Sequence, residues 1–436
     1  MFQTLIKAFK IKEIRRKILI TLALLFVYRL GCYIPVPGMG NMYDGLKGYN
    51  YLTIMNAVSG SALQYGTLFA MGIGPYINAS IIIQLLAYAI PSLERLSKQG
   101  EEGRKKIANY TRYMTLLLAI AQALGIIIGI GVKGGYVDTT KIFNIYDNSK
   151  FLEILSYIFL VIVYTAGAAV TMWIGERITD YGVSNGISML IFAGILATAG
   201  NSVISLFTSF SLTKFWKVLG FAIAAVVVFA AVVTVEDAER KIPVQYAKQV
   251  KGRKMFGGSS TNIPIKLNAS GVMPLIFAFA LLSFPELIMN LFGLSTETSK
   301  FYAGWTKWVG SGSWLYNVLL CLLILFFAYF YQQMQFNPED ISKSIQQNGG
   351  FIPGIRPGKP TGDYLKKISN RITLFGAIYL AIVALIPSII FTFIDPSLSG
   401  VFSATGLLIV VSVALEFNQA LESQIRMTNY KGFLKS

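Results

Sequence analysis

The stretch GIGPYINASIIIQLL, residues 72–86, places Gly, Pro and Asn inside one of the most apolar segments of the chain. Proline lacks a backbone N–H and clashes with the preceding turn, so a segment built only to cross lipid would avoid it. The same Gly-x-x-Pro-x-Ile pattern recurs at residues 271–276, GVMPLI. Two interrupted apolar segments in corresponding places of two halves indicate a pathway at the membrane midplane. The sequence therefore predicts a membrane conduit.

The composition predicts an all-α integral membrane protein. Of the 436 residues, 54% are hydrophobic and 14% are charged, and the mean hydropathy is +0.58. Soluble proteins carry about 25% charged residues, and an apolar run of about 20 residues is long enough to cross a bilayer core. We expect ten transmembrane helices, at residues 18–36, 68–91, 113–132, 151–175, 183–206, 215–236, 271–293, 314–336, 373–394 and 401–421.

The basic residues predict the orientation of these spans. Of the 38 Lys and Arg residues, 29 lie in the N-terminal arm, the alternate loops on that side and the C-terminal tail, and eight lie in the other loops. Lysine and arginine accumulate on the cytoplasmic side, so both termini are expected there. Ten spans divide into an N-terminal half, 1–206, and a C-terminal half, 207–436, each with five spans. An odd number of spans per half makes the halves inverted repeats if they are homologous.

Several kinds of chemistry are absent from the sequence. The chain has no histidine, which excludes a His-based triad, a His-containing zinc site and a His proton relay. The two cysteines, Cys32 and Cys321, lie in predicted spans, so we expect no disulfide framework. We expect no catalytic residue, metal or cofactor. If the chain moves a substrate, the energy must come from a partner or a gradient.

Two long loops form the main polar surface. Loop 237–269 holds seven basic residues interleaved with aromatic ones, and loop 337–372 carries Gly-Gly and Pro-Gly turns around Arg356. Both loops are longer than a helix connection needs, which favours docking of an acidic or RNA-bearing partner over a plain basic loop. The residues expected to bind that partner are Arg240, Lys241, Lys248, Lys251, Arg253, Lys254, Arg356 and Lys359.

Two further features lie in or near the first span. Residues 43–61 are too polar to span the membrane and too apolar for a plain loop, so we expect a short helix folded back into a cavity. Arg29 is the one basic residue inside a predicted span, and snorkelling to the outer surface is one explanation for it. The sequence assigns Arg29 no role.

Several motifs closely resemble the SecY family of bacterial protein-conducting channels. They occur in family order as RLGCYIPVPG (29–38), GPYINASIIIQLL (74–86), GEEGRKKIANYTRY (100–113), GERITDYGVSNGISMLIFAGI (175–195), IPVQYAKQVKGRKM (242–255), NGGFIPGIRPGK (348–359) and YKGFLK (430–435). The resemblance implies a central pore between the two five-helix halves. By position within these motifs, the pore constriction falls on Ile73, Ile77, Ile187, Ile191, Ile276 and Ile409. A ring of branched aliphatic side chains would exclude water and ions.

The resemblance also implies a plug and a lateral gate. The plug falls on about residues 53–65, within the segment expected to fold back, and includes Thr53, Asn56, Ser59, Gly60, Ser61, Ala62 and Tyr65. Asn78, Gln122 and Asn268 match polar positions of the gate. A hydrogen bond between such groups is worth only about 0.6–2 kcal/mol in a membrane, so an apolar signal sequence could displace it.

The function implied by the resemblance is a passive channel in the plasma (inner) membrane that moves unfolded secretory polypeptides across it and releases apolar segments into lipid. The implied partners are SecE-type and SecG-type small membrane subunits, a SecA-type ATPase, the ribosome with its RNA and proteins, and signal peptides with their nascent chains. Anionic lipids are a further expected partner.

The main alternative from a different class is a proton- or ion-coupled secondary transporter, which also uses inverted repeats and interrupted helices. Such a transporter usually keeps a buried acid for coupling, and the nearest candidates here are Glu153, Glu286 and Glu416. An enzyme acting inside the membrane is a third option, which the missing histidine argues against.

Overall fold

The computed structural model of the chain divides into two compact units. Unit 1 contains Met1–Phe210, Ala280–Tyr316 and Val413–Ser436, and unit 2 contains Ser211–Phe279 and Asn317–Ser412. The expected division into residues 1–206 and 207–436 stays a prediction, since unit 1 also contains two segments from beyond residue 206. The structure describes residues 2–46, 50–132, 134–143, 150–208, 215–246, 249–251, 254–256, 260–268, 271–291, 300–310, 313–394 and 404–433.

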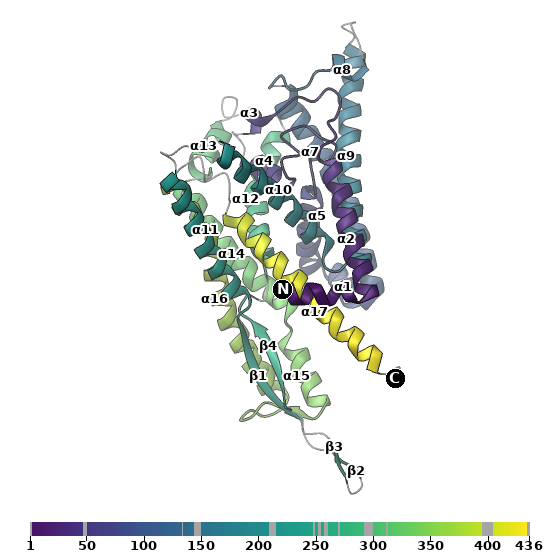
Figure 1. The fold of residues 1–436 in the computed structure, drawn as a ribbon, viewed down its shortest axis with the longest axis vertical. Coiled ribbons are helices and arrows are strands. Elements are labelled where there is room, and N and C mark those ends of the chain that lie inside the picture. The colour runs from purple at the N-terminus through teal and green to yellow at the C-terminus, as the bar shows by residue number, and fades with distance from the viewer. Residues whose placement is uncertain are drawn as a thin grey trace. The chain divides into compact units, whose positions relative to one another are not determined.

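Unit 1 is built around a set of long helices (Figure 1). Helix α7 packs against α5 and α9, and α9 packs against α2 and α10. Short helices lie between the long ones because Gly and Pro punctuate the apolar runs. The helices of unit 1 are α1 (Phe2–Lys10), α2 (Lys12–Gly31), α3 (Tyr43–Leu46), α4 (Asn50–Val58), α5 (Gly74–Ala89), α6 (Pro91–Lys98), α7 (Gly100–Ile126) with a π-helical turn at Ile127–Val132, α8 (Thr140–Phe143), α9 (Lys150–Tyr181), α10 (Gly186–Thr208) and α13 (Lys300–Val309).

Unit 2 combines apolar helices with a polar part that contains strands. Its helices are α11 (Phe215–Glu236), most of α14 (Trp314–Gln335), α15 (Pro338–Gln347) and α16 (Lys359–Ile394), while α12 (Met273–Leu291) and α17 (Ala404–Phe433) contribute residues to both units. The strands are β1 (Glu239–Tyr246), β2 (Gln249–Lys251), β3 (Lys254–Phe256), β4 (Ser260–Lys266) and β5 (Gly350–Phe351). They form an antiparallel sheet in the order β4-β1-β5 and a separate β2-β3 pair.

Each of the ten predicted apolar runs overlaps one long helix, namely α2, α5, α7, α9, α10, α11, α12, α14, α16 and α17. Four helical stretches in the described part of the chain are long and apolar enough to cross a membrane: Gly100–Gly129, Lys150–Tyr181, Trp314–Gln347 and Lys359–Leu385. A fifth is counted if Gly74–Ala89 and Pro91–Ser97, which meet at 106°, form one bent span. The count of ten spans in two inverted halves stays a prediction.

The two Gly-x-x-Pro motifs lie at the starts of helices rather than inside them. Gly72 has φ +51° and α5 starts at Gly74, while Gly271 has φ +61° and α12 starts at Met273. A left-handed glycine reverses the chain, and proline in the first helical turn removes no helix hydrogen bond because that N–H would be unpaired anyway. Each motif therefore sets where its helix starts.

The two predicted loops of unit 2 are folded and share a core. We call residues 237–268 and 337–372 the polar head. Strands β1 and β4 pair along their length, with Glu239 opposite Lys266, and β5 joins β1 at Gln245. The hydrophobic core of the head is a cluster of buried aliphatic side chains, namely Ile242, Val244, Ile265, Ile345, Ile352, Leu365, Ile368 and Ile372. The long α16 begins within the head at Lys359, so part of the predicted loop is helix.

Candidate functional site

The six isoleucines of the predicted constriction lie near helix starts or in helices. Ile73 precedes α5 and is buried, and Ile77 follows in its first turn, whereas Ile187 and Ile191 occupy the first turns of α10. In unit 2, Ile276 lies in the first turn of α12 and Ile409 in α17. Ile77 and Ile276 each stand two residues after the proline that opens the helix. The matching backbone of the two motifs gives these two isoleucines the same local position.

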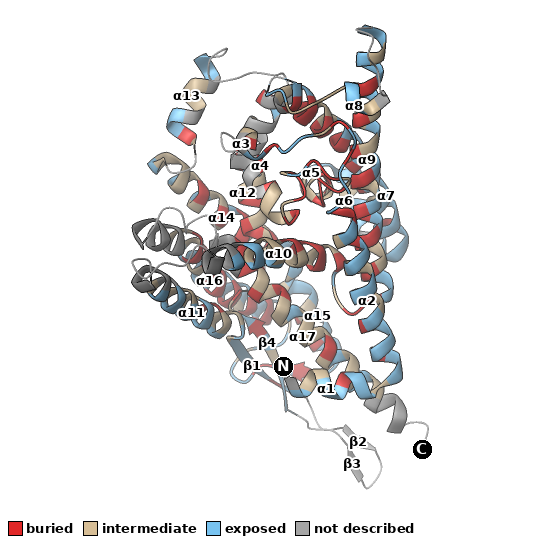
Figure 2. Ribbon diagram, turned by 45° about the horizontal axis from the view of Figure 1, so that its top comes forward, coloured by how far each residue is buried: buried red, intermediate tan, exposed pale blue. Residues whose placement is uncertain are grey.

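The predicted plug is a folded part of unit 1. Its helix α4 packs against α10, and Leu52, Met55 and Leu63 enter a buried cluster with residues of α7 and α9. The connection from α4 to α5 is largely buried (Figure 2). The short helix expected within residues 43–61 is therefore present and packed.

Polar groups fix the turn that follows α4. The Asn56 Oδ1 accepts the Gln64 N–H at 2.9 Å, and the buried Ser59 hydroxyl donates to the Asn56 carbonyl at 3.1 Å. Ser61 has φ +68°, the one left-handed non-glycine residue in the described part of the chain. Ala62 is fully buried and Tyr65 is 51% exposed. Only the backbone of Thr53 is described.

The predicted gate residues differ in their surroundings. Gln122 in α7 is buried, and neither polar atom of its amide has a hydrogen-bond partner among the described residues. The Asn268 side-chain amide donates to the Glu236 carboxylate at 2.7 Å, while its Oδ1 is buried without a partner in that same set. Asn78 is half-buried in α5. Sequence reasoning missed Glu236, because this residue is the last one of a predicted span and looks like any acidic residue at a helix end.

Arg356 is exposed on a short, rigid loop of the polar head. Gly354 and Gly358 flank it with φ +82° and +95°, and the Thr361 hydroxyl donates to the Arg356 carbonyl at 2.8 Å. The Ser342 hydroxyl of α15 donates to the Gly358 carbonyl at 2.6 Å. These contacts fix the backbone of the loop and leave the Arg356 guanidinium exposed on its surface.

The other predicted docking residues are partly described. Arg240, Lys241 and Lys359 are exposed, and Lys241 pairs with Glu239 at 3.2 Å. Lys248 and Arg253 lie outside the described residues, and only the backbones of Lys251 and Lys254 are described.

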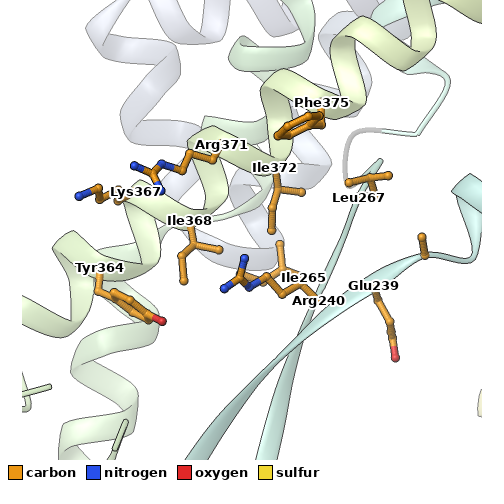
Figure 3. Close-up of a pocket in the computed structure, with 11 residues that line it drawn as sticks. Glu239, Arg240, Ile265, Leu267, Tyr364, Lys367, Ile368, Arg371, Ile372 and Phe375 are labelled. Carbon is orange, nitrogen blue, oxygen red and sulfur yellow. The ribbon is translucent and has the colours of Figure 1, made fainter. Parts of the chain in front are cut away.

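A cleft of about 650 Å³ lies between β1, β4 and α16 in unit 2 (Figure 3). Arg240 lines it from β1, and Lys367 and Arg371 line it from α16. No ion pair of these three cations is found in the described part of the chain. The remaining wall is mostly apolar, with Ile265, Leu267, Ile368, Ile372 and Phe375. Glu239, which pairs with Lys241, is the one acidic residue of the lining. Sequence reasoning missed Lys367 and Arg371, because no pattern in the sequence shows that α16 brings them to Arg240.

Comparisons with known proteins agree over most of the chain. The SecY family model matches residues 67–418. The Protein translocase subunit SecY of Streptomyces scabiei is 40% identical over 441 residues, which cover 98% of this chain and 99% of that protein. One similar solved structure is described as showing that the plug domain of the SecY protein stabilises the closed state of the translocation channel and maintains a membrane seal. It has a TM-score of 0.62 at 19% identity and covers 94% of this chain and 92% of that one. Sec61 in a canine ribosome–channel complex from the endoplasmic reticulum has a TM-score of 0.61 at 17% identity, with the same coverages.

Proposed function

This chain belongs to the SecY family of protein-conducting channels, and from that premise we propose that it carries unfolded secretory polypeptides across the plasma membrane and releases apolar segments sideways into lipid. It is a multi-pass membrane protein and a channel subunit, not an enzyme. The expected channel function is confirmed, which leaves the transporter alternative without support. The observation that carries the proposal is the full-length relationship to translocase subunits.

The direction of transport rests on the orientation proposed from charge. The exposed basic residues of the polar head outnumber its exposed acids. Placing this head in the cytoplasm, with both chain termini, satisfies the distribution of Lys and Arg. A SecA-type ATPase or a ribosome would then meet the head before the polypeptide enters. SecE-type and SecG-type subunits complete the proposed assembly.

We assign the proposed resting seal to the six isoleucines and the plug. Branched aliphatic side chains resist wetting without binding a passing chain tightly. Support comes from the shared position of Ile77 and Ile276 in two equivalent helix starts, and from the compact packing of α4 within unit 1. The likeness to a structure described by its plug and membrane seal agrees with this assignment.

We assign lateral release to Asn78, Gln122 and Asn268. A buried amide without a partner is costly, which favours a site whose polar groups find partners in another state of the channel. Gln122 and Asn268 each carry such unpaired atoms in the described part of the chain. The lateral gate is the part of the proposal that an insertion assay tests directly.

Replacing Asn268 with leucine is expected to lower the hydrophobicity that a test segment needs for release into lipid. The change removes the amide that donates to Glu236 and leaves that carboxylate without this partner. A partly buried carboxylate that loses one of its hydrogen bonds favours a state in which water reaches it. An insertion assay over a graded Leu/Ala series measures the threshold, and Asn262→Leu, on an exposed residue of β4, is the control. An unchanged threshold for Asn268→Leu and Asn78→Leu would remove these residues from the gate.

We assign binding of anionic lipids to the cleft of Figure 3. A lining with three cations, one acid and a mostly apolar wall suits a phosphate-bearing headgroup with its acyl chain, because each basic residue near such a surface contributes about 1 kcal/mol. Lys367→Glu with Arg371→Glu should reduce binding of a short-chain phosphatidylglycerol at least about tenfold, measured by native mass spectrometry of the detergent-purified complex. Equal loss of inorganic phosphate binding would identify the cleft as a plain anion site.

A further inference from the structure

Arg29 lies near the end of α2 and directs part of its guanidinium toward the plug. A methyl group built on Gly60 would stand 2.1 Å from the Arg29 Nη1, so this nitrogen lies against the glycine itself. The Nη1 is buried and has no hydrogen-bond partner among the described residues. The Nη2 donates to the Tyr33 hydroxyl at 3.3 Å, and the guanidinium carbon lies 5.2 Å from the centre of the Tyr33 ring. A snorkelling arginine would carry its whole head to water, which Arg29 does not do.

Gly60 also lies close to α10. The same methyl group would lie 3.2 Å from the Gly194 carbonyl oxygen, and one built on Gly194 would lie 1.8 Å from the Val58 carbonyl oxygen. The Thr198 hydroxyl of α10 donates to the Ala57 carbonyl at 3.1 Å. Gly60 also has φ +70°, a conformation that side chains disfavour. The turn Ser59–Ser61, which we call the plug turn, therefore lies against both the Arg29 guanidinium and the α10 backbone.

The charge of Arg29 suits this place. Helix α4 ends at Val58, and the C-terminal end of a helix carries partial negative charge on its last carbonyl groups. The permanently charged guanidinium of Arg29 lies against Gly60, two residues beyond that end, and is attracted to these carbonyl groups. Tyr28, the preceding residue, stacks on Phe69 at 6.0 Å between ring centres, so the last turns of α2 contact both ends of the segment between α4 and α5.

We propose that Arg29 is a positioning residue for channel closure, which holds the plug turn in its seat through packing and charge. This inference rests on the proposed sealing role of the plug. The buried Nη1 forms no hydrogen bond with the described residues in the seated state, so release of the turn breaks no directional bond there.

The test measures two quantities separately, namely how often the plug turn leaves its closed position and how much ion current passes the resting channel. Ser59→Cys places a nearly isosteric thiol on the plug turn, in a chain whose Cys32 and Cys321 are replaced by alanine. Labelling by a membrane-impermeant maleimide, in vesicles holding the complete channel complex, reports how often the turn leaves. We expect Arg29→Leu to raise the labelling rate about tenfold and to raise resting ion conductance. Arg29→Lys should have a smaller effect than Arg29→Leu, because lysine keeps the positive charge. Some effect should remain, because lysine lacks the planar fork that reaches both Tyr33 and the turn.

Arg177 provides a matched control. Its guanidinium carbon also lies over aromatic rings, 5.5 Å from the Trp173 centre and 5.6 Å from the Tyr181 centre. Arg177 lies in α9, however, and among the described residues it has no contact with the plug turn. Arg177→Leu should leave both readouts unchanged. Gly60→Ala should release the turn, and combining it with Arg29→Ala should have less effect than the sum, because the second change removes the atom with which the new methyl group collides.

The results separate the proposed role of Arg29 from the proposed sealing role of the plug. Unchanged labelling and conductance in Arg29→Leu, or additive effects of Gly60→Ala and Arg29→Ala, would overturn the role of Arg29. Deletion of residues 53–65 tests the plug itself. If that deletion raises conductance while Arg29→Leu does not, the plug seals without Arg29. If the deletion leaves conductance unchanged, the sealing role of the plug fails.

Discussion

Replacing Arg356 with glutamate is expected to abolish ATP-driven transport of a preprotein while resting conductance and subunit assembly stay normal. Arg356 is exposed, and its backbone is fixed by two left-handed glycines and by the Thr361 hydroxyl. A guanidinium held in this way can clamp a carboxylate or an RNA phosphate through two parallel hydrogen bonds. Losing one side of a desolvated charge pair costs about 2–5 kcal/mol, which is well over tenfold in affinity.

Arg356→Lys should retain part of the transport, because lysine keeps the charge and cannot form the two-bond clamp. Arg426→Glu makes the same change of charge on an exposed residue of α17 and serves as the control. The measurement is transport into vesicles together with a binding titration of a SecA-type ATPase. Normal transport by Arg356→Glu would mean that docking depends on the rest of the head, where Arg240 and Lys241 are exposed.

The apolar helices could be predicted from the sequence because each depends on local composition. Every predicted run overlaps a long helix, yet the limits shifted where backbone conformation decides. The run expected from residue 68 yields a helix only from Gly74, because Gly72 adopts φ +51° and Pro75 suits a first turn. Hydropathy does not report that change, since residues 68–73 are as apolar as the helix that follows.

The contacts of the candidate site could not be predicted in the same way. The hydrogen bond from Asn268 to Glu236 joins residues 32 positions apart, and the cleft joins Arg240 to Arg371. Arg29 illustrates the limit most clearly. Its cost inside a span is visible in the sequence, but its neighbour Gly60 follows only from how α2, α4 and α10 pack. Tertiary packing, which no local pattern encodes, selects these pairs.

Replacing Ile77 and Ile276 together with glycine is expected to raise resting ion conductance in planar bilayers. Both residues stand two positions after a proline that opens a helix, in GIGPYI and GVMPLI. A hydrophobic constriction excludes ions because its wall does not hold water. Removing two branched side chains leaves bare backbone, which water can hydrate. The effect should exceed that of either single change, since one side chain can partly cover the gap left by another.

The control for this experiment must destabilise the same helices to the same extent. Glycine in place of a larger residue destabilises a helix by about 1 kcal/mol, so a leak could arise from loosened helices alone. Ile82→Gly with Ile288→Gly makes the same substitutions in the same two helices, α5 and α12, beyond their first turns. Unchanged conductance in that pair together with raised conductance in Ile77→Gly/Ile276→Gly supports the constriction. Equal leaks from both pairs would show that helix stability, rather than a ring of isoleucines, keeps the channel closed to ions.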